Sequence, residues 1–200
     1  MSDAPLPPVA FFTQHTVADY EVWRKSFDSS QHVRKAASAL GHHVNRGADN
    51  PNLVAIYMPA TDRKAFEALL SSPQLKEAMQ KAGATSAHST QVLKPIENHI
   101  IGDRATAGVI VTAEVEDFAA WKKGYDAGSA LRSNHGIIGH AVNQLADHPN
   151  TVVVYHQGES VQALRTFFAS AELKAAMKGG GVKGAPKVEF FNGTGGMVIY

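Results

Sequence analysis

Short apolar runs alternate along the chain with segments in which apolar residues recur every three or four positions. The runs Val9–His15 and Val109–Ala113 are typical of strands buried on both faces. Asp19 and Asp117 follow them and are predicted to cap a helix. Each helix carries aromatic residues spaced to share one face, namely Tyr20, Trp23 and Phe27 in the first and Phe118, Trp121 and Tyr125 in the second.

The segments that follow predict a hairpin, a second helix and a final strand, twice over. Gly41 and Gly139 are expected to end the first helices. Two strands then flank Asp-x-Pro-Asn turns at 49–52 and 147–150. A second helix is expected to begin near Thr61 in the first repeat and near Ser160 in the second. A last strand follows near 87–93 and near 187–191, respectively. The order βαββαβ is that of a ferredoxin-like unit.

The chain is an internal duplication. Residues 9–93 align without a gap on residues 107–191, and about two dozen positions are identical, including both tryptophans. We therefore expect a tail at 1–8, ferredoxin-like repeats at 9–93 and 107–191, a linker at 94–106 and a tail at 192–200 that could add an edge strand. The predicted fold is α+β: two tandem ferredoxin-like units pack sheet to sheet and close a barrel within one chain. The sequence does not decide whether such chains assemble further into a homo-oligomer.

Composition narrows the functions considered. The chain has 200 residues, 44% hydrophobic and 18% charged, with a net charge of +1 and no cysteine. The absence of a basic block argues against a nucleic-acid partner, and no apolar run has the roughly 20 residues of a membrane helix. No signal peptide is recognisable and cysteine is lacking, so we expect a cytoplasmic protein.

At this point the residues resemble a known group. The pattern Val-x-Asp-aromatic-x-x-Trp-x-x-x-aromatic-Asp, then Gly-His, then Asp-x-Pro-Asn, occurs in both repeats. It resembles the dimeric α/β-barrel superfamily and, within it, antibiotic-biosynthesis-monooxygenase-like (ABM-like) domains. The resemblance implies a protein that binds a small aromatic or polyketide-like molecule, as a monooxygenase or cyclase without a cofactor. The alternative is a non-catalytic binding or stress-associated module, so whether the chain is an enzyme stays open.

The resemblance includes haem-degrading members, so the sequence can be checked for their haem-ligating residues. Haem-degrading members carry a Trp in the second helix and, about ten residues on, the His that ligates iron. The matching positions here hold Leu69 and Met79, and Phe167 and Met177. We therefore expect no haem ligation by this helix and no cofactor.

Candidate ligand-binding residues come in duplicated pairs. Trp23 and Trp121 fit the core of the fold first and a pocket wall second. Arg34 and Arg132 follow the tryptophans by eleven residues, almost three turns at ~3.6 residues per turn of one continuous helix. On that face each guanidinium needs either a partner in the protein or the anionic part of a ligand.

The first hairpin strand supplies further candidates. His42 and His140 either hydrogen-bond locally or serve as a general base. Asn45 and Asn143 fall on the opposite face of the strand, so they cannot act with these histidines through sequence proximity alone. Tyr57 and Tyr155 lie in the second hairpin strand, and we expect their hydroxyl groups to reach the same ligand-binding space. The ten histidines show no metal-ligand spacing, so no metal site is expected.

Overall fold

The computed structural model describes residues 5–101 and 107–200, and it shows two successive βαββαβ units. The first unit consists of β1 (Val9–Thr16), α1 (Tyr20–Ser29), α2 (Gln31–Ala36), β2 (Gly41–Gly47), β3 (Leu53–Ala60), α3 (Arg63–Leu70), α4 (Pro73–Lys81) and β4 (Ser89–His99). The second consists of β5 (Ala107–Val115), α5 (Phe118–Ala127), α6 (Ser129–Asn134), β6 (Ile137–Leu145), β7 (His148–Gly158), α7 (Val161–Ala169), α8 (Ala171–Gly179) and β8 (Val182–Gly193), followed by β9 (Val198–Ile199).

Side-chain caps fix the starts of the long helices. The Asp19 carboxylate accepts a hydrogen bond from the Val22 backbone N–H, and the Asp117 carboxylate accepts one from Ala120. These bonds satisfy backbone donors that have no partner within the helix. Both caps were predicted from the sequence and are confirmed.

The first helix of each unit is broken, which corrects the expectation of one continuous helix. In the first unit α1 ends at Ser29 and α2 begins at Gln31. The predicted stops at Gly41 and Gly139 are also wrong, because both glycines lie in strands. The left-handed backbone that ends the helical region lies earlier, at Ser38 (φ 78°) and Gly136 (φ 77°), where the chain must turn back to enter the sheet.

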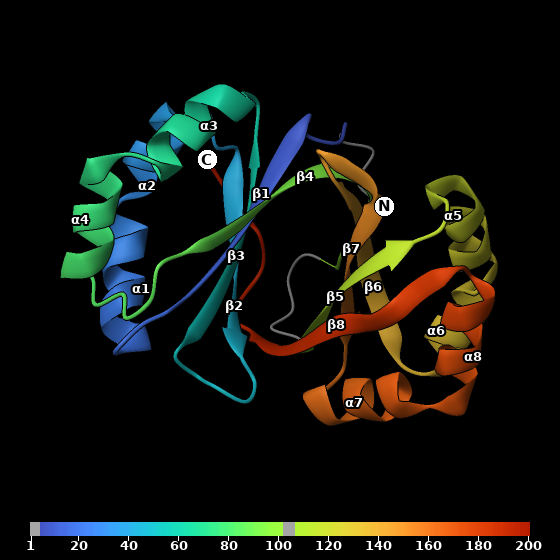
Figure 1. Ribbon diagram of the computed structural model, residues 1–200. Helices are drawn as coiled ribbons and strands as arrows, with labels where there is room; N and C mark the ends of the chain where they lie inside the picture. Colours follow the sequence, from blue (N-terminus) through green and yellow to red (C-terminus); the bar gives the residue numbers. More distant parts are fainter. Residues whose placement is uncertain (1–4, 102–106) are drawn as a thin grey trace.

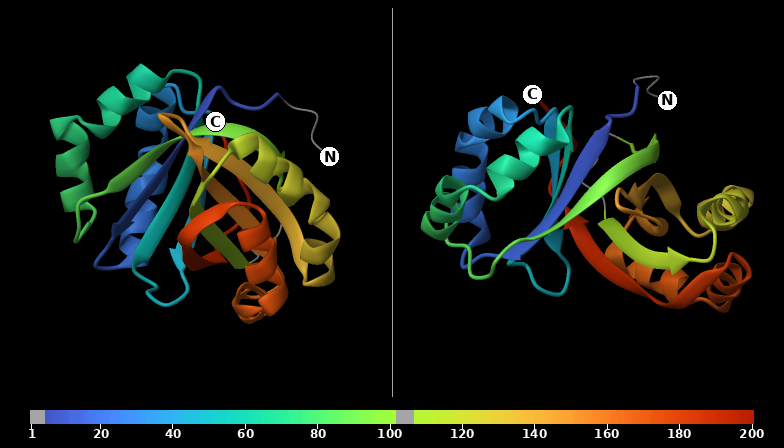
Figure 2. Two further views of the ribbon diagram at one scale, coloured as in Figure 1. Left: turned by 45° about the vertical axis from the view of Figure 1, so that its right-hand side comes forward. Right: turned by 45° about the horizontal axis from the view of Figure 1, so that its top comes forward.

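The eight long strands form one closed barrel, with the helices of each unit on its outside (Figures 1 and 2). Neighbouring strands follow the order β3-β1-β4-β6-β7-β5-β8-β2, and β2 also pairs with β3. Two antiparallel seams join the units, one between β4 and β6 and the other between β8 and β2. The predicted fold of two ferredoxin-like units closed sheet to sheet is confirmed, and the seams make the barrel continuous.

The seams also explain why two strands are longer than expected. β4 was expected to end at Leu93 but runs to His99, and its second half pairs with β6. β8 likewise continues to Gly193 beside β2. Half of the predicted linker is therefore strand, because a strand gains a full ladder of hydrogen bonds from a partner in the other unit. The rest of that linker, at 102–106, lies outside the described residues.

The hydrophobic core has three layers. Under the helices, the first unit has one cluster, which includes Trp23 (3% exposed), and the second unit has two, one of which includes Trp121 (8% exposed). Both tryptophans thus belong to the core, as their spacing predicted. A further cluster fills the barrel between the units; it comprises Ala10, Phe12, Ala55, Leu93, Ile110, Val153 and Phe191. No helix in the described ranges is long and apolar enough to cross a membrane.

The C-terminal segment folds back onto the first unit. β9 pairs with the start of β2, so that Val198 lies opposite His42 and Ile199 opposite Gly41. The tail thus forms an additional strand, as the sequence suggested it could. The strand brings Tyr200 against the core cluster under the helices of the first unit.

Candidate functional site

Each unit contains a cavity between its helices and its sheet. The cavity of the second unit measures about 260 Å³ and that of the first about 220 Å³. Trp121 and Arg132 line the second cavity, and Trp23 and Arg34 line the first. The structure therefore brings each predicted Trp–Arg pair to one cavity, although the helix between them is broken.

Arg132 is held against the wall of the second cavity. It comes from α6 and is 8% exposed, and its guanidinium carbon lies 3.7 Å from the centre of the Tyr125 ring. Its Nη1 donates a hydrogen bond to the backbone oxygen of Tyr125. The cation–π contact and this bond fix the side chain, and Arg132 is among the residues that line the cavity.

A tyrosine–histidine pair completes the polar part of this cavity. The Tyr125 hydroxyl and His156 Nε2 are 3.0 Å apart, and both residues line the cavity. Burial, with smaller contributions from Arg132 and His140, lowers the pKa of His156 to about 3, so the imidazole is neutral near neutral pH. The sequence analysis did not propose His156 as a site residue, because the first repeat holds Met58 at the matching position.

Arg34 in the first cavity has an additional partner from the C-terminal tail. Its Nη1 donates to the Phe27 backbone oxygen at 2.7 Å, and its Nε donates to the Tyr200 hydroxyl at 2.6 Å. The guanidinium lies 3.7 Å over the Phe27 ring, as Arg132 lies over Tyr125. The remaining nitrogen, Nη2, is buried without a partner. Tyr200 thus accepts a hydrogen bond from Arg34 Nε, whereas no described residue accepts one from the corresponding nitrogen of Arg132.

The first cavity has its own histidine, on a different strand. His15 comes from β1, packs edge-on to Trp23 at 5.6 Å between ring centres, and has two buried ring nitrogens without partners. Burial, helped by His88, lowers its pKa to about 4. In the second repeat, Ala113 occupies the position that matches His15, and the cavity histidine is His156 on β7. The two cavities therefore share an arginine but differ in where the imidazole stands.

Neither buried arginine pairs with a carboxylate among the described residues. The arginine ion pairs there belong to Arg24, Arg46, Arg63 and Arg165. An unpaired buried guanidinium is costly unless carbonyls, aromatic faces or a ligand compensate it. The described residues thus supply no carboxylate partner, although carbonyl, hydroxyl and aromatic groups of the protein contact the two guanidinium groups. Binding of an anionic ligand stays a prediction.

Comparison with known proteins gives the fold its name. No protein-family model and no curated protein matches the sequence. Among solved structures, an anthrone oxidase-like protein matches with a TM-score of 0.65 and 17% identity, over 93% of this chain and 91% of its own. A candidate monooxygenase from Lactobacillus acidophilus NCFM gives 0.61 and 15%, over 97% and 99%. The chain has the dimeric α/β-barrel fold. The resemblance seen in the sequence is thus confirmed at the level of fold.

A third solved structure is described as a ferredoxin fold protein related to antibiotic biosynthesis monooxygenases, from Listeria monocytogenes 4b F2365. It matches this α/β barrel with a TM-score of 0.55 and 10% identity, over 94% of this chain and 95% of its own. Identities this low show the common architecture and leave the activity to the site itself.

Four of the predicted ligand-binding residues lie inside the barrel, on the other side of the sheet. Asn45, Tyr57, Asn143 and Tyr155 line a cavity of about 190 Å³ between the two units. The Tyr155 hydroxyl donates to Asn45 Oδ1 at 3.2 Å, and Asn143 donates to a backbone oxygen. All four side chains are uncharged near neutral pH, because burial raises the pKa values of Tyr57 and Tyr155. These four side chains therefore offer neutral hydrogen-bonding groups to the inner cavity, whose lining also includes His43 and Glu97.

His42 and His140 lie at the starts of β2 and β6, on the helix side of the sheet. His42 Nδ1 is 2.8 Å from the Tyr200 hydroxyl, and His140 Nε2 is 2.5 Å from Glu97 Oε1. Asn45 points into the barrel, so the predicted separation of His42 and Asn45 onto opposite faces is confirmed. Neither histidine is among the described residues that line the two helix-side cavities. Their role as a general base stays a prediction.

The positions considered for haem ligation line the helix-side cavities. Leu69 and Met79 face the first cavity, and Phe167 and Met177 face the second. None of the four is the histidine that ligates iron in the haem-degrading members. We predict that titration with haemin gives no stoichiometric complex with a sharp Soret band that depends on this helix. A complex abolished by Met79→Ala or Met177→Ala would contradict the prediction, and Lys76→Ala serves as the surface control.

Proposed function

We propose that the second helix-side cavity binds a small aromatic compound through one anionic group, a carboxylate, phenolate or enolate, with Arg132 as its partner. The observation that carries the proposal is a buried guanidinium on an apolar cavity that no carboxylate of the described residues lines. A planar guanidinium matches such anions with paired hydrogen bonds. Trp121, Phe167 and Phe168 supply apolar walls for an aromatic ring.

The second cavity is preferred to the first because of what surrounds each arginine. Arg34 Nε already donates to Tyr200, whereas Arg132 has only the Tyr125 backbone oxygen as a hydrogen-bond partner among the described residues. A ligand in the first cavity would have to displace the tyrosine or accept fewer bonds. The duplicated fold thus carries one open arginine and one occupied by the tail.

The chemistry expected of this cavity follows from the charge on Arg132. A positive group beside a phenol or enol lowers the pKa of the ligand and stabilises its anion. That anion is electron-rich, so it is the form that reacts with molecular oxygen or rearranges. With a pKa of about 3, His156 is a weak base, so we assign it and Tyr125 to orienting the ligand by hydrogen bonds.

Binding is tested by calorimetric titration with salicylate and 1-naphthoate, using 1-naphthalenemethanol as the neutral analogue. Arg132→Met should weaken binding of the two anions at least about tenfold, the value of one charge-assisted hydrogen bond, and leave the neutral analogue unchanged. Arg34→Met is the matched control and should change affinity less than about twofold. Equal losses in both variants, or none in Arg132→Met, would refute the assignment of the site.

Catalysis is tested separately from binding. If the protein is a monooxygenase without a cofactor, a bound polyphenol or anthrone should consume oxygen at an electrode, and Arg132→Met should abolish the uptake. Binding without oxygen uptake or rearranged product favours the second candidate, a non-catalytic small-molecule-binding module. The first repeat has Phe27 and Met58 where the second has Tyr125 and His156, and either function accommodates this difference.

A further inference from the structure

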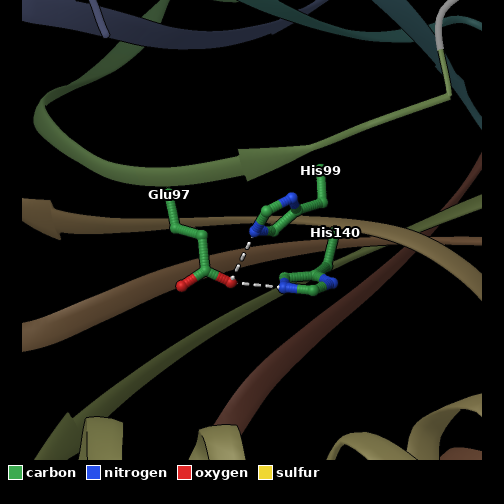
Figure 3. Close-up of side chains that lie close together, drawn as sticks. All are labelled: Glu97, His99 and His140. Carbon is green, nitrogen blue, oxygen red and sulfur yellow. Dashed lines mark hydrogen bonds and ion pairs between the residues drawn. The ribbon is translucent and has the colours of Figure 1, made fainter. Parts of the chain in front are cut away.

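Two histidines and a glutamate gather on the helix side of the sheet at the seam between the units (Figure 3). Glu97 and His99 belong to the second half of β4, and His140 belongs to β6. His99 and His140 are directly opposite each other in the antiparallel register. Glu97 is two residues before His99, so it points to the same face of the strand.

The distances within this cluster suit a small metal ion. Glu97 Oε1 lies 2.5 Å from His140 Nε2 and 3.5 Å from His99 Nε2, and the possible ligand atoms all lie within 4.8 Å of one another. Tetrahedral zinc with bonds of about 2.0–2.2 Å separates its ligand atoms by roughly 3.3 Å. Rotamer adjustments on the order of 1 Å would bring the three atoms to that spacing.

We propose that Glu97, His99 and His140 form a binding site for a divalent transition-metal ion of the zinc type. Two imidazoles and one carboxylate form a donor set typical of zinc with an open fourth position for water. The His99 side chain is 48% exposed, which gives the ion a path from solvent, while those of Glu97 and His140 are 19% exposed. The proposal is independent of ligand binding at Arg132.

The surroundings of Glu97 supply the outer contacts that such a site needs. Lys122 Nζ lies 2.5 Å from Glu97 Oε2, the oxygen that faces away from the histidines, and 2.6 Å from Asp126 Oδ1. Lys122 therefore orients the carboxylate without occupying Oε1. With neutral histidines, Glu97, Asp126 and Lys122 together carry a charge of −1, which favours a cation and is opposed by the positive charge of Arg132 that acts on His140.

The duplication provides an internal comparison. His42 is the counterpart of His140, but the positions that match Glu97 and His99 hold Gly195 and Met197. His42 hydrogen-bonds to Tyr200 instead. The site therefore exists in one copy only, at the β4–β6 seam, and the β8–β2 seam lacks the other two ligands.

The site is next to the second helix-side cavity but separate from it. The Tyr125 ring lies 5.7 Å from the His140 ring, between centres, and also lines the cavity. His140, His99 and Glu97 are not among the residues that line it. A bound ion would therefore stiffen one wall of the cavity without necessarily touching its ligand.

The test is calorimetric titration of the untagged full chain with ZnCl₂, and visible absorption with CoCl₂ as a probe of coordination geometry. We expect one ion per chain and the absorption bands of tetrahedral Co²⁺. Glu97→Gln, His99→Ala and His140→Ala should each weaken binding at least about tenfold, the scale of losing one metal ligand. His148→Ala, an exposed histidine elsewhere, should leave the affinity unchanged.

His99→Ala keeps the test decisive if the two more buried substitutions disturb folding, because His99 is half-exposed. The thermal midpoint of each variant without metal provides the folding check. An absence of stoichiometric zinc binding would overturn the proposal. So would binding that survives His99→Ala in a folded variant, since the ion would then lie at other surface histidines.

Discussion

A chain cut to residues 1–101 is expected to lose the monomeric fold of the intact protein. Such a fragment would expose both seam edges, since β4 would lack β6 and β2 would lack β8. It would also expose its share of the cluster inside the barrel, including Phe12 and Leu93. The loss exceeds about 5 kcal/mol, the lower end of the stability of a small domain, so the half should self-associate or stay unfolded.

Sedimentation analysis of the fragment and of the full chain measures this outcome directly. The fragment should form a dimer that rebuilds a symmetric barrel, or it should aggregate. Mixing it with residues 107–200 should restore a one-to-one complex with the mass of the intact chain. A fragment that is well folded and strictly monomeric would show that the two units are independent domains and would refute the closed barrel.

Acidification from pH 7 to pH 5 is expected to destabilise the protein strongly. His15 and His42 are buried, and burial lowers the pKa of each from 6.5 to about 4. Between these values the unfolded chain binds protons that the folded chain does not. The free energy of unfolding therefore falls as the pH falls from 6.5 toward 4. At pH 5 each histidine contributes a loss of roughly 2 kcal/mol, at ~1.4 kcal/mol per pH unit.

Urea unfolding at pH 7 and at pH 5 measures the loss. In His15→Ala, which copies the residue of the second repeat, the difference between the two pH values should shrink by about 2 kcal/mol. The exposed His32→Ala is the matched control and should keep the full difference. If His15→Ala shows the same loss as the unchanged protein, His15 is not the buried neutral group that the structure indicates.

The proposed metal site depends on a single strand pairing in the fold. His99 and Glu97 lie in what the sequence presents as a polar linker, and His140 lies in the second repeat. No ligand spacing exists along the chain, so a search for metal motifs passes over them. Only the register of β4 against β6 places the three side chains on one patch.

The sequence by itself determined the elements and their repetition. The gapless duplication, the capping aspartates and the aromatic stripe containing Trp23 are local or periodic signals, and each depends on interactions within a few residues. Strand alternation was enough to place His42 and Asn45 on opposite faces, because side chains alternate every residue whatever the partner strand. These signals fixed the ferredoxin-like units before any tertiary contact was known.

The tertiary structure decided what lies between units and around the cavities. The helix break at Ser30, before Arg34, and the turn at Ser38 that leads into β2 leave no mark in the helical periodicity of the sequence. Tyr200 reaches Arg34 across 166 residues, and His156 meets Tyr125 across 31. Such pairings are set by long-range register and packing, which leave no periodic trace in the sequence. They determine which arginine stays open to a ligand.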